Sequence, residues 1–187
     1  LDDKATMKWW RNEIKGAWTF AAFFGAARRS LARFVGIDED KIAPLYDEFW
    51  TTFSGVKAWQ DNLIKQYEKV GYVQNLRGFR RRAPIAPNEL INAPIQADEA
   101  AIVMDAMTRL SELEDPVYQA NLEIHDDLTF FLPEKDIDVH AEKIIDTMLA
   151  CPYEWAKVVP LTIEMSEGPN WGELREVGSF SSDTWGK

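Results

Sequence analysis

Two short β-hairpin patterns, separated by a long helical pattern, constrain the fold of this chain more than any other feature. Residues 71–82 and residues 121–132 each form two strand-like segments around a tight turn. Between them, the stretch from Asn88 to Leu110 becomes an apolar helical pattern after an entrance rich in amides and prolines. Long helices mixed with short antiparallel hairpins predict an α+β fold.

Further elements are predicted on both sides of the two hairpins. The first is a helix with apolar side chains at three-to-four spacing, which ends in an aromatic cluster before Gly25. The chain contains no internal repeat. The expected set is a helix over residues 4–26, mostly helical structure over 38–70 with a break at Ser54-Gly55, a helix over 133–150, a strand near 158–165 and a polar tail.

The composition is that of an ordinary globular chain. Its 187 residues, 46% of them apolar, suffice for one domain or for a lobe of a larger enzyme. No apolar run approaches the ~20 residues that span a bilayer, so we expect a soluble, cytoplasmic protein with no membrane partner. The first residue is leucine, which suggests a processed, trimmed or partial product. The single cysteine, Cys151, excludes an internal disulfide and is interpreted as structural.

The charge is distributed unevenly along the chain. Residues 1–82 hold 15 Lys and Arg against 10 Asp and Glu, whereas residues 83–187 hold 6 against 21. A basic stretch with interleaved aromatic residues suits a polyanion, and an acidic stretch suits solvent, cations or a basic partner. The two parts of the chain are therefore expected to face different partners.

The tripeptide His125-Asp126-Asp127 is the strongest candidate for metal binding. Adjacent carboxylates at a tight turn repel each other, and a divalent cation such as Mg²⁺ relieves the repulsion by sharing their oxygens. Helical metal phosphohydrolases also use a His-Asp pair, but they need further histidines, and His140 is the only other one in the sequence.

Two sets of polar residues are candidates for contacts with nucleic acid. Arg80 and Arg82 share one face of the second strand of the first hairpin, and Arg81 lies on the other. At least one of them is expected to face a phosphate or an acidic residue, and a solvated charge run is the alternative. Asn92 and Gln96 share a helix face, where amides either bond base edges or, as the pattern favours, cap backbone groups.

Four segments, in order along the chain, resemble motifs of the family A DNA polymerases, the DNA polymerase I family. The stretch from Arg11 to Gly25 is similar to the fingers-helix motif, and the segment around His125 is similar to the palm motif that usually ends His-Asp-Glu. The four segments are 11–25, Asn92-Ala93-Pro94-Ile95-Gln96, 122–128 and 159–171. The resemblance implies the C-terminal fingers and palm portion of a right-hand polymerase, with a fingers-like region over 1–70 and a palm-like region over 71–187.

The resemblance also implies a role for residues of the first motif. Arg11 and Lys15 would contact the triphosphate of an incoming deoxynucleoside triphosphate, which suits two cations one helical turn apart. Phe20 would stack near the incoming base and sugar, and Phe24 would stack near the templating base. Lys15 is also a candidate catalytic residue.

The remaining motifs would bind metal and DNA. Asp126, with Asp127 as a second candidate, would hold two Mg²⁺ ions for phosphoryl transfer and act as a catalytic residue. His125 and one arginine of the run Arg80, Arg81 and Arg82 would hold the primer strand of a primer-template. Asn92 and Gln96 would touch the minor groove beside the new base pair, where the acceptors are nearly the same for every correct pair.

The chain departs from the family pattern in several places, a variation similar to that of phage-encoded or other divergent members. There is one residue more than usual between Lys15 and Phe20, so either the helix bulges there or the lysine correspondence is shifted by one. Asp127 replaces the usual glutamate, and Asn88 stands where the family commonly has an arginine.

One expected motif is absent. The family has a first metal-binding aspartate, in an Asp-x-Ser-x-x-Glu motif some tens of residues before the fingers helix, and only ten residues precede Arg11. We therefore predict a second polypeptide that carries the upstream palm, the thumb and any exonuclease, and an isolated chain that is inactive. The alternative is a non-catalytic nucleic-acid-binding or assembly subunit of a replication complex.

Overall fold

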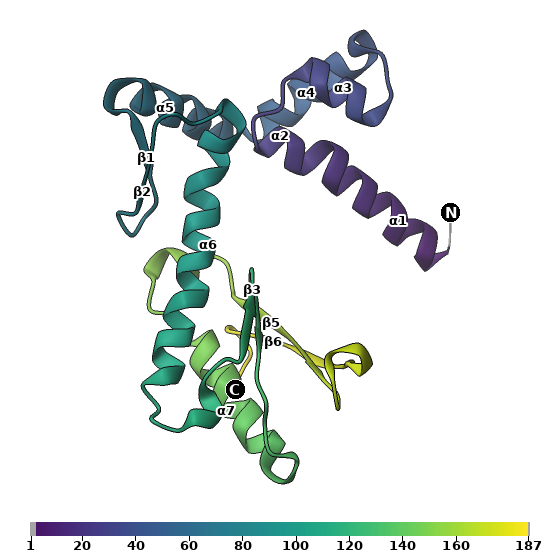
Figure 1. Ribbon diagram of the computed structural model, residues 1–187. Coiled ribbons are helices and arrows are strands. Elements are labelled where there is room, and N and C mark those ends of the chain that lie inside the picture. Colours follow the sequence, from purple (N-terminus) through teal and green to yellow (C-terminus); the bar gives the residue numbers. More distant parts are fainter. Residues whose placement is uncertain (1–2, 187) are drawn as a thin grey trace. The chain divides into compact units, whose positions relative to one another are not determined.

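The computed structural model describes residues 3–186 and confirms the predicted α+β class (Figure 1). The chain forms two compact units that divide between Asp98 and Glu99, inside helix α6. This division differs from the predicted boundary after residue 70, because residues 71–98 pack with the first unit. The assignment of fingers-like and palm-like regions stays a prediction.

The first unit is mostly helical. A rod at its start is followed by three further helices, a hairpin and the first turns of α6 (Figure 1). Each predicted element is present, and α3 is an addition to the prediction. The elements are α1 (Lys4–Ile14), the π-helix η1 (Lys15–Phe20), α2 (Ala21–Phe23), α3 (Arg28–Val35), α4 (Glu39–Thr52), α5 (Ser54–Val70), β1 (Tyr72–Gln74), β2 (Arg80–Arg82) and α6 (Pro87–Ser111).

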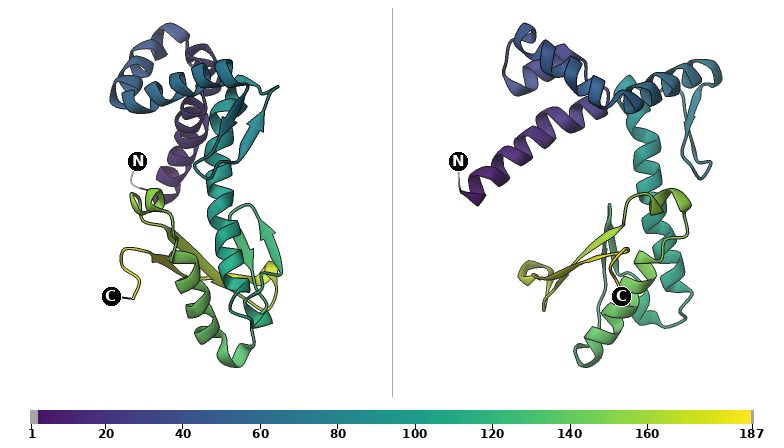
Figure 2. Two further views of the ribbon diagram at one scale, coloured as in Figure 1. Left: turned by 90° about the vertical axis from the view of Figure 1, so that its left-hand side faces the viewer. Right: turned by 180° about the vertical axis from the view of Figure 1, so that it is seen from behind.

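The second unit holds two hairpins, α7 and the second part of α6. Strands β3 and β4 pair as one antiparallel hairpin, and β5 pairs with β6 as another (Figure 2). Its elements are the 3₁₀-helix η2 (Pro116–Tyr118), β3 (Leu122–Ile124), β4 (Asp127–Thr129), η3 (Glu134–Asp136), α7 (Ile137–Leu149), η4 (Glu154–Lys157), β5 (Thr162–Glu167), η5 (Trp171–Glu173) and β6 (Arg175–Ser181).

The end of the chain was predicted wrongly. The expected polar tail contains β6, which pairs with β5 from Thr162 opposite Ser181 to Glu167 opposite Arg175. The predicted strand also begins later than expected, at Thr162, because Pro160 has no N–H to donate to a strand ladder. A single Phe and Val among polar residues hid the alternation of β6 in the sequence.

Each unit has its own buried residues. In the first, Ala22, Leu31, Ala32 and Ile42 form one cluster, against which aromatic residues of α4 pack. A second cluster in the same unit joins α5, β1 and α6 and consists of Leu63, Val73, Leu90 and Ile91. The buried residues of the second unit come chiefly from α6 and α7 and include Ala106, Leu110, Ala141, Ile144, Ile145 and Leu149.

Among the described residues, no helix is both long and apolar enough to cross a lipid bilayer. The cytoplasmic location expected from the sequence stays a prediction.

Candidate nucleic-acid and metal-binding residues

A π-helical turn interrupts the first helical rod where the sequence has its extra residue. The turn covers Lys15–Phe20, between the α-helical segments α1 and α2. A π-turn accommodates one additional residue without ending the helix. Of the two alternatives predicted for this segment, a helix bulge or a shifted lysine, the structure has the bulge.

The π-turn also brings two candidate residues together. Hydrogen bonds from residue i to i+5 place side chains five apart on one face, whereas in an α-helix they diverge. The Lys15 ammonium accordingly lies 4.9 Å from the centroid of the Phe20 ring, within the range of a cation–π contact. Both side chains are exposed, as is Arg11, so this face of the rod presents cations and an aromatic ring to solvent.

The aromatic side chains at the end of the rod make two different sets of contacts. The Phe20 and Phe24 rings are tilted by 34°, with centroids 6.1 Å apart. Phe23 instead packs against Phe49 and Phe53, at centroid distances of 5.2 and 5.1 Å. The predicted stacking residues thus lie side by side, with Phe20 exposed and Phe24 half-buried, and the predicted roles of both stay predictions.

The helix end itself is closed by a Schellman motif. Gly25 N–H donates to the Ala22 carbonyl (2.9 Å), and Ala26 N–H donates to the Ala21 carbonyl (2.8 Å). Gly25 has φ +86°, and a Cβ there would lie 2.6 Å from Ile91 Cδ1. Only glycine meets both conditions without strain or displacement of Ile91.

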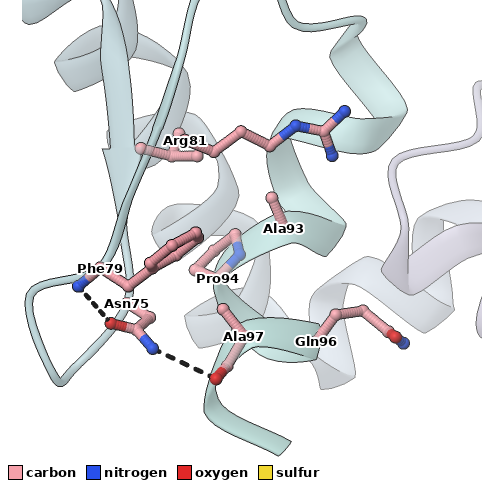
Figure 3. A pocket seen from close by; sticks show the side chains of 8 residues that line it. Asn75, Phe79, Arg81, Ala93, Pro94, Gln96 and Ala97 are labelled. Atoms are coloured by element: carbon pink, nitrogen blue, oxygen red, sulfur yellow. Dashed lines mark hydrogen bonds between the residues drawn. The ribbon is translucent and has the colours of Figure 1, made fainter. Parts of the chain in front are cut away.

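The first hairpin is held against α6 by a buried amide and a carboxylate. Asn75 accepts from the backbone N–H groups of Phe79 (2.8 Å) and Arg77 (3.1 Å) and donates to the Ala97 carbonyl (3.2 Å), as Figure 3 shows in part. The Asp98 carboxylate accepts from Leu76 N–H (3.0 Å). Burial raises the pKa of Asp98, and the Leu76 hydrogen bond opposes this shift.

The three arginines of β2 have different surroundings. Arg81 pairs with Glu89 at 2.6 Å, so one arginine does face an acidic residue, as predicted. Arg80 donates to Gln74 and lies over the Tyr72 ring. The Arg82 guanidinium makes no hydrogen bond or ion pair with another described side chain, which leaves it available to an anion.

The amides predicted at the entrance of α6 lie within the helix instead. Asn92 and Gln96 are the sixth and tenth residues of Pro87–Ser111, so the prediction that they cap its start is wrong. Gln96 is exposed, and Asn92 is half-buried with an Oδ1 that accepts no hydrogen bond. Beside them a shallow pocket of about 210 Å³ is lined by Val73, Asn75, Phe79, Arg81, Ala93, Pro94, Gln96 and Ala97 (Figure 3).

The acidic hairpin has a two-residue turn. Ile124 pairs with Asp127, which leaves His125 and Asp126 as the loop. His125 has φ +60°, as the first residue of a type II′ turn requires. Asp126 therefore lies at the tip, but Asp127 is the first residue of β4 and not part of the tip as the sequence suggested.

The donor chemistry of this hairpin fits part of a magnesium site. Mg²⁺ is typically held by one or two carboxylates, with water and substrate phosphates as the other ligands. Asp126 and Asp127 are exposed and offer two carboxylates. No group of three or more His, Cys, Asp or Glu side chains suited to a metal ion occurs within residues 3–186.

Sequence reasoning missed the residues that hold these candidates in place. Asn75 is 6% exposed and Gln60 is 1% exposed, and both bond to backbone groups on other elements. Gln60 lies on the apolar face of α5, between Val56 and Leu63. A polar residue within an apolar helical stripe is the signal that could have found it.

Comparisons with known proteins agree with the motifs. A model of DNA polymerase family A matches residues 2–173. DNA polymerase I of Chloroflexus aurantiacus is 30% identical over 168 residues, which cover 83% of this chain and 18% of that protein. DNA polymerase I of Bacillus subtilis is 27% identical over 170 residues, which cover 83% of this chain and 19% of that protein.

A solved structure has the same fold. It is the POL domain of Pol1 from M. smegmatis in complex with DNA primer-template and dNTP, with a TM-score of 0.69 at 22% identity over 76% of this chain and 28% of that one. The present chain spans about a fifth of the length of the curated relatives it matches. Since the family model covers most of its residues, the chain belongs to DNA polymerase family A.

Proposed function

We propose that this chain is the C-terminal part of a template-directed DNA polymerase, which extends a primer 3′ end with deoxynucleotides by two-metal phosphoryl transfer. The family supports the reaction, and one observation carries the assignment of the site to this chain. A helix face with Arg11, Lys15 and Phe20 and a hairpin tip with Asp126 are both exposed, in the order of the family's motifs.

The residues of the first unit would bind the two substrates. Arg11 and Lys15 donate to the triphosphate oxygens and offset their charge. Phe20 stacks on the incoming nucleotide, and Phe24 stacks at the templating position, without distinguishing among the bases. Lys15 leaves its position over the Phe20 ring when it engages a phosphate, which exposes that ring to the nucleotide.

Further polar residues would position the duplex. Arg82 binds a phosphate of the primer strand, since its guanidinium is the one in the run not engaged by a neighbouring side chain. Asn92 and Gln96, on one face of α6, contact minor-groove acceptors beside the new pair. His125 contacts the primer terminus from the tip of the acidic hairpin.

Asp126 and Asp127 are the residues that would hold magnesium. The bound ions would activate the primer 3′-hydroxyl and neutralise the leaving pyrophosphate. Water and substrate phosphates would complete part of the coordination of these ions. A further carboxylate, shared by the two ions, would come from the upstream palm on a second polypeptide that also carries the thumb, and we expect the isolated chain to be inactive.

Primer extension tests this proposal. The chain is combined with the polypeptide that co-purifies with it from its native source, and extension is measured with Mg²⁺. Asp126→Ala should reduce extension at least ~100-fold while primer-template binding is retained, because a metal ligand is lost. Asp138→Ala removes a similarly exposed carboxylate from α7 and should leave the rate unchanged.

Two other outcomes would be decisive. Full extension by Asp126→Ala in the assembly would favour the alternative function, a non-catalytic nucleic-acid-binding or assembly subunit. Full extension by the isolated wild-type chain would exclude the need for a second polypeptide.

A further inference from the structure

The end of the first helical rod leaves one backbone acceptor to be satisfied. The Schellman motif engages the carbonyls of Ala21 and Ala22. The next carbonyl, that of Phe23, is among the last four of the helix, which have no intrahelical partner. Its position is important because Phe24, a predicted stacking residue, follows it directly in the chain.

Gln60 supplies the missing donor. Its Nε2 donates to the Phe23 carbonyl at 2.8 Å, across 37 residues of sequence. The side chain is 1% exposed, so water cannot easily replace it. A buried amide that loses its partner is costly, and the bond is therefore held at one geometry.

The residues around Gln60 hold this hydrogen bond in place. Leu63, one turn further along α5, belongs to the buried cluster with Val73 and Ile91. The side chain of Ile91 in turn approaches Gly25 so closely that a Cβ on residue 25 would lie 2.6 Å from Ile91 Cδ1. The helix end is thus restrained from α5 by a hydrogen bond and from α6 by packing.

We propose that Gln60 is a positioning residue for the aromatic pair Phe20 and Phe24. By holding the Phe23 carbonyl it fixes the last turn of the rod, and with it the direction in which the Phe24 ring points. This inference rests on the proposed function, because the pair has a role in catalysis only if it stacks on nucleotide and template.

Binding of primer-template that carries 2-aminopurine at the templating position tests the inference. Gln60→Met keeps the length of the side chain and removes the donor. We expect about a three- to tenfold loss of affinity and weaker stacking-dependent quenching, because base–aromatic stacking contributes much of such binding. The slope of affinity against salt should not change, since no phosphate contact is lost.

Three controls separate positioning from general stability. Gln66→Met makes the same chemical change at an exposed position of α5 and should have no effect. Ile144→Val should lower the melting temperature through the buried residues of the second unit and leave the quenching unchanged. Gln60→Asn keeps the amide on a shorter side chain and should give an intermediate loss of affinity and quenching. It replaces Gln60→Met in these measurements if Gln60→Met does not fold.

A double-mutant cycle identifies the residue through which Gln60 acts. Phe24→Ala in the Gln60→Met background should cost little more than Phe24→Ala alone. Additive losses, or unchanged quenching in Gln60→Met, would overturn the positioning role while the proposed function stands. If the wild-type chain does not bind primer-template even in the assembly with the second polypeptide, the proposed function is overturned and this inference with it.

Discussion

The two hairpins that carry candidate residues have the same strand length and opposite surroundings. The basic hairpin, β1 and β2, buries Val73 and Asn75 and is bonded to α6 at two points. The acidic hairpin, β3 and β4, has all three residues of β3 exposed, and Leu122 and Ile124 are 40% and 41% exposed. An isolated two-stranded hairpin is marginally stable. The difference indicates that the basic hairpin is anchored within its unit through β1 and its loop, whereas the apolar side chains of β3 have no comparable cover in theirs.

Removal of the buried Asn75 amide should have the largest effect on the difference between the two hairpins. Asn75→Ala should lower the free energy of unfolding of the first unit by about 2–3 kcal/mol, because two backbone N–H groups of the loop lose their acceptor. Asn121→Ala on the acidic hairpin removes one exposed bond to Phe131 N–H and should cost below ~1 kcal/mol. Urea unfolding measures both, and equal losses would show that the hairpins are anchored alike.

The arginines allow a finer test of the basic hairpin. Arg82→Ala should weaken primer-template binding about fivefold and reduce the salt slope by ~1, because one phosphate contact is lost. Arg81→Ala should have less effect, since Glu89 already engages that guanidinium. Binding titrations from low to high salt give both quantities. A larger loss for Arg81 would mean that the Glu89 pair opens on DNA.

The backbone of the acidic hairpin offers a matched pair of substitutions. His125→Gly should stabilise the second unit by about 0.5–1 kcal/mol, because φ +60° costs a residue with a Cβ more than it costs glycine. Glu114→Gly, also at φ +60°, should give a similar gain in urea unfolding. Only His125→Gly should also weaken binding to the primer terminus, and equal DNA affinities would remove His125 from the site.

The smallest expected effect is a pH dependence in the basic hairpin. A carboxyl whose pKa is raised in the folded state contributes stability below its unfolded pKa, near 3.8, and loses that contribution as pH rises through the folded pKa. Asp98→Asn keeps an acceptor for Leu76 N–H and removes the titration. The wild type should therefore lose stability relative to Asp98→Asn as pH rises from 3 to 6, and a parallel pair of pH curves would contradict this.

The sequence predicts the elements of this fold well where a local signal exists. Both hairpins have strand-like segments around a turn, and α6 has a long apolar pattern. The strand β6 was missed because Gly178 and flanking polar residues obscure its alternation. Its partner β5 lies across an irregular connection, and pairing of that kind has no local signal.

In the candidate site, too, local features can be predicted and long-range contacts cannot. The cationic, aromatic and acidic residues of the motifs can be recognised in the sequence, since each motif is contiguous. The residues that restrain them are not, because Asn75 bonds a carbonyl 22 residues away and Gln60 bonds one 37 residues away. Even the caps predicted at Asn92 and Gln96 failed, because the helix begins earlier, at Pro87.

The π-turn has a consequence for how such a helix tolerates insertion. In a regular α-helix one added residue rotates everything beyond it by about 100° and would turn Phe23 out of the core. Here the added residue is absorbed within Lys15–Phe20, so Phe23 still packs against Phe49 while Phe24 lies beside Phe20. A π-turn therefore lets a helix accept one extra residue while the side chains beyond the turn keep their original orientation around the helix axis.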